Sequence, residues 1–447
     1  MSFPRYPKYK ASGVEWLGDV PERWHATPIK HLGRLKGGAG FPHEKQGVEG
    51  EELSFHKVNA LAQADGDGFL LQSDNTITRD TASQLGAFVF PPQTIVFAKV
   101  GAALLLGRIR LINHDACIDN NMMGLVVQHD QFCIGFVRHA MSLVRFDLIA
   151  NPGAVPSLNE GQIGDFRLPI PPLDEQTKIA SFLDRETSKI DGLVGEQRRL
   201  MELLKEKRQA VISHAVTKGL NPHAPMKPSG IEWLGEVPEH WEVTRLGFLC
   251  FKIGSGKTPS GGGEAYLSEG ITFIRSQNVY DDGLRLDDVV YVSEETDAEQ
   301  SWSRVLPGDI LLNITGASLG RTCLVPSVFD RANVNQHVCI LRLTSAASRT
   351  FIAMVLKSSG MKSQFDSAQN GAAREGLNFA QISKLALALP PQSEQDAIVR
   401  HLETELAKFD TLTAEAQRAI DILQERRTAL ISAAVTGQID VRRHPKN

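Results

Sequence analysis

Several features are missing from this 447-residue chain, and each absence excludes a class of protein. No apolar run approaches the roughly 20 residues that a membrane helix needs, and the opening "MSFPRYPKYK" is polar, unlike a secretion signal. We therefore expect a cytoplasmic protein. The five cysteines are scattered and never spaced C-x-x-C, so the sequence indicates neither a disulfide framework nor a zinc ribbon. The histidines stand singly, and we expect none of them to bind a metal.

Motifs of the common nucleic-acid enzymes are also missing. An amino-methyltransferase needs an "NPPY"-type loop, but "NPGAVP" (residues 151–156) has neither the paired prolines nor the aromatic, and no "PD…ExK" nuclease set is apparent. "GSGKT" (residues 254–258) looks like the end of a phosphate loop, yet the full pattern needs a glycine where Phe251 stands. "PSGGG" also follows where a helix should start. We expect no catalytic residue, metal or cofactor in this chain.

The chain has no basic excess, since its 48 Lys and Arg are outnumbered by 52 Asp and Glu. A DNA-binding chain usually carries surplus positive charge, so a net charge of −4 argues weakly against nucleic acid. No long segment is strongly acidic, however. Any contact with DNA must therefore come from the local placement of Lys and Arg.

What the sequence does contain is an internal repeat. "SGVEWLGDVPERW" (residues 12–24) returns as "SGIEWLGEVPEHW" (residues 229–241), 217 positions later. Three further pairs keep nearly the same offset: "FPPQTIVFAKVGA" (90–102) with "VLPGDILLNITGA" (305–317), "NNMMGLVV" (120–127) with "NQHVCILR" (335–342), and "SLNEGQIGDFRLPIPPLDEQTKIASFLD" (157–184) with "GLNFAQISKLALALPPQSEQDAIVRHLE" (376–403). An offset that persists through the chain is typical of a duplicated unit and not of chance.

Each copy reads as a mixed globular stretch followed by a long helix. Short β-branched runs such as "TIVFAKV" and "DILLNIT", bounded by Gly and Pro, predict strands. Residues 132–149 and 349–365 have the spacing of amphipathic helices. Each globular unit is therefore expected to be an α+β domain. The repeated tryptophans are expected to serve the packing of these domains and not to stack on nucleic-acid bases; they are Trp16, Trp24, Trp233 and Trp241.

A long helix is predicted after each "PP". The "DEQ" or "SEQ" that follows places carboxylates at a helix N-terminus, and Gly219 and Gly437 stand where the two helices should stop. Apolar residues then recur every 3.5 residues, which is typical of a coiled-coil seam, the buried face between two paired helices. The expected seam residues are Ile179, Leu183, Ile190, Leu193, Leu200, Leu204, Val211, Ile398, Leu402, Phe409, Leu412, Leu423 and Leu430.

Charges within the seam indicate that the two helices pair with each other in opposite directions. Parallel pairing would place Glu186 beside Glu405, and Lys207 beside Arg426. Like charges would then repel each other at both contacts. Antiparallel pairing instead brings Glu186 near Arg426, and Lys207 near Glu405. We therefore predict two globular α+β domains, related by a pseudo-twofold axis and separated by a rod of two antiparallel coiled-coil helices, roughly 65 Å long. The expected segments are domain 1–172, helix 173–221, domain 222–391, helix 392–437 and tail 438–447.

A rod that carries two domains suits double-stranded DNA. Half-sites on one face of DNA lie about 34 to 36 Å apart per helical turn, which such a rod can span. Because the two domains share a scaffold but differ in most of their interior sequence, we expect them to read two different half-sites. The target is then bipartite and asymmetric.

Three motifs also carry a family resemblance. "YKASGVEWLGDVPERW" (residues 9–24), "PPLDEQTKIASFLD" (171–184) and "LISAAVTGQIDVR" (430–442) together resemble the specificity subunit of type I restriction-modification systems. The resemblance covers essentially the whole chain. It implies two target-recognition domains that each read half of a split DNA sequence, joined by two antiparallel helices, with no catalysis in the chain itself.

The same resemblance implies partners for the chain. They are two copies of an S-adenosylmethionine-dependent adenine methyltransferase subunit, to which restriction translocase subunits that use ATP and Mg²⁺ can be added. In the family, the helix regions 205–219 and 424–438 help to dock the methyltransferases. The residues alone leave one alternative open, a scaffold protein whose coiled-coil rod spaces two protein-binding domains.

Candidate DNA contacts follow from the chemistry of groove recognition. Base readout needs Arg, Lys, Asn or Gln at groove level, and phosphate contacts need Lys, Arg or backbone amides. Such residues stand at expected strand ends and Gly-rich loops where the two copies differ. They are Lys57, Asn59, Lys99 and Arg108 in the first domain, and Arg275, Gln277, Asn278, Arg321 and Arg374 in the second.

Overall fold

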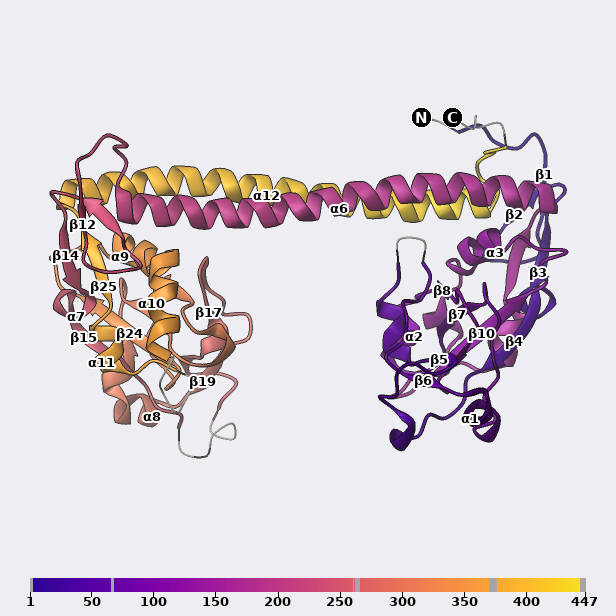
Figure 1. Ribbon diagram of the computed structural model, residues 1–447, viewed down its shortest axis with the longest axis horizontal. Coiled ribbons are helices and arrows are strands. Elements are labelled where there is room, and N and C mark those ends of the chain that lie inside the picture. The colour runs from indigo at the N-terminus through magenta and orange to yellow at the C-terminus, as the bar shows by residue number, and fades with distance from the viewer. Residues whose placement is uncertain (1–2, 66–67, 260, 262–265, 370–375, 443–447) are drawn as a thin grey trace. The chain divides into compact units, whose positions relative to one another are not determined.

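The computed structural model of the protein describes residues 3–65, 68–259, 261, 266–369 and 376–442, and it forms two compact units. Unit 1 contains Met1–Gln197 and Gln417–Asn447, and unit 2 contains Arg198–Ala416. Each unit therefore combines one globular domain with about half of each long helix (Figure 1). Among the helices of the described ranges, none combines the length and the apolar character needed to span a bilayer.

Unit 1 is built around an antiparallel sheet of order β4-β10-β7-β8 and a smaller sheet of order β6-β5-β9, in which β5 and β9 are parallel. Its strands are β1 (Tyr9–Ala11), β2 (Asp19–Pro21), β3 (His25–Pro28), β4 (Gly33–Gly37), β5 (Leu53–His56), β6 (Thr76–Ile77), β7 (Ile95–Ala98), β8 (Arg110–Leu111), β9 (Ala116–Ile118), β10 (Met122–Val127) and β11 (Arg167–Ile170). Its domain helices are α1 (Arg79–Gln84), α2 (Ala102–Leu105), α3 (Ile134–Met141), α4 (Phe146–Ile149) and α5 (Glu160–Asp165).

Unit 2 repeats this topology, with sheets of order β15-β24-β21-β22 and β19-β16-β23-β20, in which β16 and β23 are parallel. Its strands are β12 (Met226–Pro228), β13 (Glu236–Pro238), β14 (Glu242–Arg245), β15 (Cys250–Ser255), β16 (Ile271–Ile274), β17 (Val279–Tyr280), β18 (Gly283–Leu284), β19 (Val290–Val292), β20 (Arg304–Val305), β21 (Ile310–Asn313), β22 (Thr322–Leu324), β23 (Ala332–Val334), β24 (Val338–Leu343) and β25 (Ala386–Leu389). Its domain helices are α7 (Leu246–Leu249), α8 (Glu294–Glu299), α9 (Arg349–Leu356), α10 (Ser359–Gln369) and α11 (Phe379–Ser383). The shared order confirms the duplicated α+β fold.

Two helices expected from periodicity are each broken in two. Residues 132–149 form α3 and α4, and residues 349–365 fall in α9 and α10. In unit 2 the break is at Ser358, whose hydroxyl accepts a hydrogen bond from the backbone N of Met361 at 3.3 Å. A serine that caps a new helix competes with continuation of the preceding one. The apolar period continues across this break, so periodicity alone does not reveal it.

The repeated tryptophans divide into a buried and an exposed pair. Trp24 and Trp241 are fully buried in the cores of units 1 and 2, as predicted. Trp16 is 45% exposed and stacks on Phe166 with ring centroids 5.2 Å apart, and Trp233 is 37% exposed. The expectation of packing within the domain is therefore confirmed for the buried pair and for Trp16, which packs at the surface of its domain.

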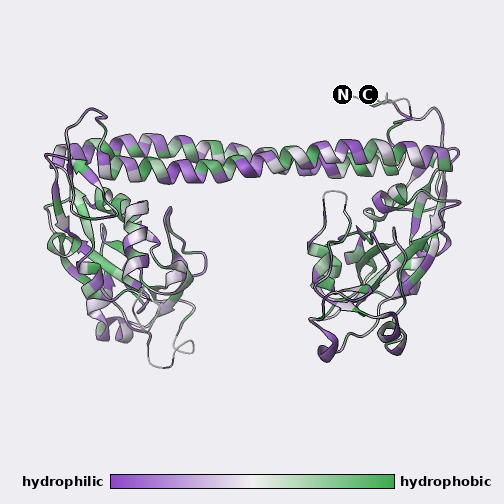
Figure 2. Ribbon diagram, viewed as in Figure 1, coloured by the Kyte–Doolittle hydropathy of each residue, from purple (hydrophilic) through white to green (hydrophobic). Residues whose placement is uncertain are grey.

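The long helices are α6 (Leu173–Lys218) and α12 (Gln392–Val435). Both end where the sequence predicts, since Gly219 and Gly437 follow with φ of 75° and 74°, a conformation that glycine adopts without strain. Hydrophilic and hydrophobic residues alternate along both helices (Figure 2). This pattern suits helices that bury only one narrow face.

In each unit the start of one long helix packs against the end of the other. In unit 1, Arg427 of α12 donates to Asp191 of α6 at 2.9 Å; in unit 2, Arg208 of α6 donates to Asp410 of α12 at 2.5 Å. These two ion pairs are copies of each other at a shift of 219 residues. The predicted antiparallel direction is therefore confirmed.

The charge partners differ from those expected. Glu186 pairs with its neighbours Arg185 and Lys189 at 3.1 Å, and Glu405 pairs with Lys408 at 2.6 Å. Lys408 is the main cause of the lowered pKa of Glu405, and Lys207 on the facing helix adds a weaker effect. The cross-helix ion pairs form one position further along, at Arg208 and Arg427, because the seam itself is shifted.

The buried face keeps the predicted 3.5-residue period but lies one residue away at alternate positions. In α6 one face of buried or half-buried residues runs through positions 183, 187, 190, 194, 197, 201, 204, 208, 211 and 215, and the ten positions 219 residues later in α12 are also buried or half-buried. Of the expected seam residues, the buried ones are Ile179, Leu183, Ile190, Leu204, Ile398, Leu402 and Phe409, and the half-buried ones are Val211, Leu423 and Leu430.

Leu193, Leu200 and Leu412 lie outside this face, at 47%, 41% and 44% exposed. Val194 is buried instead of Leu193, at 7% exposed. Consecutive residues point about 100° apart around a helix, so only one of two apolar neighbours can enter a narrow seam. The choice of leucine over valine at this step was wrong.

A glutamine fixes each long helix to its own domain in the same way. In unit 1, Gln176 accepts from the backbone N of Cys133 and donates to the carbonyl of Pro171, both at 2.8 Å. In unit 2, Gln395 makes the same two bonds to Ser348 and Pro390, again at 2.8 Å. The "EQ" of the repeated motif thus joins the "PP" stop, the long helix and the start of α3 or α9.

Candidate nucleic-acid interface

The first candidate surface is a short 3-10 helix in each unit, which follows an inner strand of the sheet that contains a parallel pair. It is η3 (Val58–Ala62) after β5 in unit 1 and η5 (Ser276–Asn278) after β16 in unit 2. Lys57 and Arg275 occupy the N-cap positions. The structure therefore places candidates from both copies at equivalent points of the fold, at the end of a buried strand.

In unit 1 this turn is held by a buried carboxylate. Asp119 Oδ2 accepts from the backbone N of Val58 at 3.1 Å, and the Asp119 backbone N donates to the His56 carbonyl at 2.9 Å. Lys57 is half-buried and its Nζ donates to Gln46 Oε1 at 2.8 Å, whereas Asn59 is exposed. Asn59 is thus the more accessible of the two candidates.

In unit 2 the equivalent turn is held by Asn278, which corrects its assignment as a DNA contact. Asn278 is 1% exposed; its Nδ2 donates to the carbonyls of Arg285 and Asp288, and its Oδ1 accepts from the backbone N of Arg275. Its amide is used inside the protein and does not face a groove. Gln277 is exposed, and its Nε2 donates to Asp288 Oδ2 at 2.6 Å.

Arg275 is largely enclosed by its own unit. Its Nη2 donates to the Asp288 carbonyl at 3.1 Å, and its Cζ lies 5.7 Å from the ring centroid of Tyr266. Only 20% of its side chain is exposed, and its buried Nε has no hydrogen-bond partner among the described atoms. Such a guanidinium can present an edge to a ligand, but its position is set by the protein.

The second candidate surface is the loop that follows β7 in unit 1 and β21 in unit 2. Each loop ends in a glycine with positive φ, Gly107 at 58° and Gly320 at 85°, followed directly by Arg108 or Arg321. These arginines stand at equivalent places, just before the strands β8 and β22. Both side chains are half-buried.

The two loop arginines have different neighbours. Arg321 lies over the ring of Tyr280 at 4.6 Å from Cζ to centroid, and Arg285 lies over the same ring at 3.8 Å. Arg108 instead lines a cleft of unit 1. Lys99 follows β7 and is half-buried, with its Nζ against Gly37. Arg374 falls outside the described residues.

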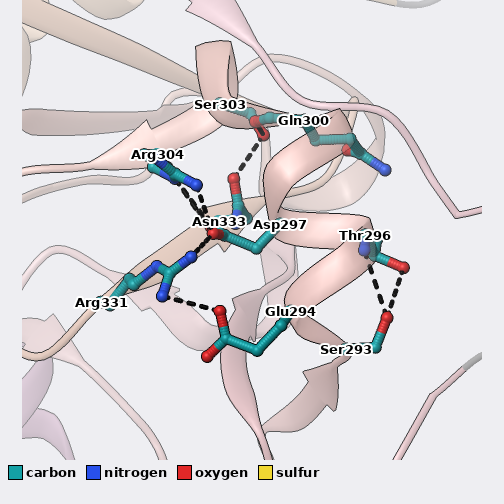
Figure 3. Close-up of polar contacts among 9 residues, drawn as sticks. All are labelled: Ser293, Glu294, Thr296, Asp297, Gln300, Ser303, Arg304, Arg331 and Asn333. Atoms are coloured by element: carbon teal, nitrogen blue, oxygen red, sulfur yellow. Dashed lines mark hydrogen bonds and ion pairs between the residues drawn. The ribbon is translucent and has the colours of Figure 1, made fainter.

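The sequence missed a buried ionic network around Asp297 of α8 (Figure 3). Asp297 of α8 is fully buried and accepts from Arg304 at 2.6 to 3.1 Å, from Arg331, and from Asn333 Nδ2 at 2.5 Å. Ser303 completes it by donating to Asn333 Oδ1 at 2.7 Å. The network ties α8 to the strands β20 and β23, and β23 pairs with β16, the strand that leads into η5.

Charge pairing dominates the electrostatics of this network. Burial alone would raise the pKa of Asp297, but the hydrogen bonds from Arg304, Arg331 and Asn333 outweigh it and lower the pKa to about 2. Asp297 is therefore ionised at neutral pH. In a single sequence these residues look like ordinary surface charges; only comparison with the first copy, where Ala82 and Cys117 stand at the matching positions, marks them as a set.

The "GSGKT" segment has the geometry of a strand and not of a phosphate loop. Its first residues lie in β15, which pairs with β24, and no helix begins in the described residues up to Pro259. Gly256 is needed because a Cβ there would lie 1.6 Å from the carbonyl oxygen of Val334. Over the described ranges, no group of three or more His, Cys, Asp or Glu could hold a metal ion.

Comparison with known proteins gives this geometry its context. The family model of the type I restriction modification DNA specificity domain matches residues 21–198 and again 238–420. The chain is 26% identical over 380 residues to the type I restriction enzyme EcoBI specificity subunit of Escherichia coli, covering 81% of this chain and 77% of the relative. It is 21% identical over 447 residues to the EcoKI specificity subunit of Escherichia coli K12, covering 96% and 92%.

A solved chain from work on complex assembly and conformational transition of the type I R-M system has the same fold. It superimposes with a TM-score of 0.67 at 15% identity and covers 93% of this chain and 98% of its own length. The two matched ranges of the family model contain one globular domain each and together exceed half of the chain. The chain therefore belongs to the type I restriction-modification specificity family, as the non-catalytic DNA specificity subunit of such a system.

Proposed function

We propose that each globular domain reads one half of a bipartite, asymmetric site in double-stranded DNA. The observation that supports the proposal is that the two units share a scaffold but carry different side chains on the equivalent 3-10 helices η3 and η5. Lys57 and Asn59 in unit 1 are matched by Arg275 and Gln277 in unit 2, on equivalent 3-10 helices. Two copies of one scaffold with different side chains at the same place are suited to two different half-sites.

The exposed candidates are the best base contacts. Asn59 and Gln277 present amides, which pair with adenine edges, and the half-buried Lys57 and Arg321 are better suited to phosphates or guanine. Lys99, Arg108, Arg275 and Arg374 complete the proposed set. Each true base contact is worth about 1 to 3 kcal/mol of discrimination, and its loss should relax one position of one half-site.

The long helices are proposed to dock two methyltransferase subunits. Support comes from apolar residues that the seam does not use and that repeat at a shift of 219: Leu193 and Leu412, at 47% and 44% exposed, and Leu203 and Ile422, at 50% and 64%. Exposed apolar residues at equivalent points favour two equal partners. S-adenosylmethionine would then belong to the methyltransferase, and ATP with Mg²⁺ to a restriction subunit, with no cofactor in this chain.

The test is to sequence DNA modification in a host with and without this chain, together with its neighbouring methyltransferase. A split methylated motif that depends on the chain is expected. Absence of any motif would favour the alternative, a scaffold that spaces two protein-binding domains. Exchange of residues 40–160 for those of a related chain should change one half of the motif; a change in both halves would contradict the assignment of one domain to one half-site.

A further inference from the structure

Unit 1 contains a cleft of about 760 Å³ between its recognition domain and its part of the helix pair. Residues of 62–65, 68–69 and 106–111 line one side, α3 lines another, and α6 and α12 close it. In Figure 1, α3 lies directly beside the helix pair. Four arginines line this cleft: Arg108, Arg110, Arg138 and Arg427.

Among the residues that the structure describes, two of these arginines have carboxylate partners at ion-pair distance. Arg138 donates to Asp184 at 2.7 Å, and Arg427 donates to Asp191 at 2.9 Å. Arg108 and Arg110 form no ion pair within the described residues. Asp65, a further carboxylate among the described lining residues, accepts from the backbone N of Phe69 at 2.8 Å.

Arg110 is the most constrained of the four. It is half-buried, its Nη1 donates only to the carbonyl of Ile109 at 3.0 Å, and its buried Nε has no partner among the described atoms. Loss of solvation lowers the pKa of Arg110, and Arg108, Arg427 and Arg138 lower it further. A buried donor without a partner, surrounded by like charge, costs free energy unless an anion is present.

The fold itself does not require this cluster. In unit 2 the residue that pairs with the same sheet position as Arg110 is Cys323, and Ala353 matches Arg138 on α9. Both units fold to the same topology although unit 2 lacks arginines at these two positions. The arginines of unit 1 are therefore better explained by a ligand than by the scaffold.

We propose that this cleft binds a phosphate group, held by Arg108 and Arg110. Planar guanidinium groups donate two hydrogen bonds in the geometry that phosphate oxygens accept, and both Arg108 and Arg110 line the cleft. The phosphate could come from the DNA backbone or from a free phosphate compound. The DNA source rests on the proposed function, whereas the free source does not.

The first test uses the full-length chain and inorganic phosphate. Thermal unfolding is measured in sodium phosphate and in sodium chloride of equal ionic strength, for the wild type, for R108Q/R110Q, and for the control R5Q/R23Q, which removes the same charge from exposed positions. Wild type and control should gain about 3 °C more in phosphate than the cleft variant at a phosphate concentration of roughly ten times Kd. An equal gain in all three proteins overturns the proposal.

The chloride buffer separates a binding role from a structural one. Because the two arginines repel their neighbours, R108Q/R110Q should melt no lower than the wild type in chloride. A lower melting temperature in chloride would mean that the arginines support the fold, which also overturns the proposal. R108K/R110K keeps the charge but loses the planar donors, so its gain in phosphate should be intermediate.

The second test distinguishes the two sources of phosphate. Affinity of the full-length chain for a non-cognate duplex is measured against salt concentration. If the ligand is a backbone phosphate, R108Q/R110Q should reduce the slope of log K against log salt by about 1 for each phosphate contact that is lost. If the slope is unchanged but the phosphate-dependent stabilisation is lost, the ligand is a free phosphate compound. A change in the methylated motif would mean that these arginines read a base, which overturns the phosphate assignment.

Discussion

Behind α1 of unit 1 and α8 of unit 2, the same backbone holds side chains of opposite character. In unit 1, Ala82 and Cys117 are buried in a small apolar cluster with Leu53, Phe55 and Ile77. In unit 2 the matching positions are Asp297 and Asn333, which form the ionic network. A core can exchange apolar contacts for a fully hydrogen-bonded ionic set, provided that the whole set changes together.

On the surface next to these two cores, an ion pair is present in both units, but the positive and negative residues have exchanged places. Arg79 of α1 pairs with Asp115 at 2.7 Å, and at the equivalent points of unit 2 Glu294 of α8 pairs with Arg331 at 2.8 Å. The contact is kept while the signs are exchanged. What differs between the units is therefore organised in compatible groups, and this allows each domain to change its chemistry without losing the scaffold.

Removal of Asp297 should cause the largest difference in stability between the two units. The change D297A leaves Arg304, Arg331 and Asn333 without their common acceptor, and loss of one partner of a buried pair costs about 3 to 5 kcal/mol. Hydrogen exchange of the full chain should show loss of protection in β16 and β23, while the equivalent strands β5 and β9 of unit 1 remain protected.

A matched rescue makes this prediction sharper. D297A combined with R304V and N333C converts the network to the residues that unit 1 carries at Ala82, Val89 and Cys117. The triple variant should recover most of the lost protection because no buried polar group is left unpaired. If D297A alone is harmless, or if the triple variant is no better, the two cores are not interchangeable solutions.

Acid should weaken unit 1 before unit 2. His56 of β5 is 1% exposed with both ring nitrogens unpartnered among the described atoms; burial, and then His114, lower its pKa from 6.5 to about 4. The unfolded state then binds the proton more readily, so stability is complete above about pH 6.5 and falls as the pH drops toward 4, by about 3 kcal/mol. His139, whose pKa is lowered mainly by burial, acts in the same direction.

For unit 2 the corresponding loss comes at lower pH. The pKa of Asp297 is lowered to about 2, so its contribution is complete above about pH 4 and is lost as the pH falls toward 2. Protection factors of β5 and β16 at pH 7 and pH 5 measure the difference. H56I is the control, since Ile274 stands at the equivalent point of unit 2; it should remove most of the loss in β5. Equal losses in both strands would contradict the assignment.

The sequence predicted the parts of the molecule that repeat, because an internal repeat reports shared constraints. The duplicated α+β topology, the two long helices and the glycines that end them could all be found in this way. The helix direction followed from charges, although the actual partners are Asp191 and Asp410. Seam positions were predictable only to within one residue, since Leu193 and Val194 are equally apolar and only packing chooses between them.

The candidate site was less predictable because its residues are defined by what they contact. Asn278 and Gln277 are adjacent amides in the sequence, yet one holds the turn and the other is exposed. Asp297, Arg304 and Arg331 lie far enough apart in sequence that no local pattern joins them. The available signal was that the two copies differ at several matched positions. These positions can be matched only when the strand register is known.

Loss of the glutamine that fixes each long helix should cost both units equally. Q176A and Q395A each leave one buried backbone N and one buried carbonyl without a partner, which costs about 1 to 3 kcal/mol. Because the bonds have the same lengths in both units, the two variants should lower the melting temperature of their own unit to the same degree. Unequal losses, measured by hydrogen exchange of α3 and α9, would mean that the two junctions are not equivalent.

Loss of a cross-helix ion pair should have the smallest effect on stability. These pairs set which positions of the two helices face each other more than they stabilise the fold. Arg427 and Asp191 are 38% and 49% exposed, and such pairs contribute roughly 0.5 kcal/mol. R427D should therefore barely change the melting temperature, and the exchange D191R/R427D should restore it. The same result is expected for R208D and R208D/D410R in unit 2. If the exchange fails in one unit but succeeds in the other, then the ion pair there responds to neighbours that the repeat does not share, and the helix pair is less symmetric than its sequence.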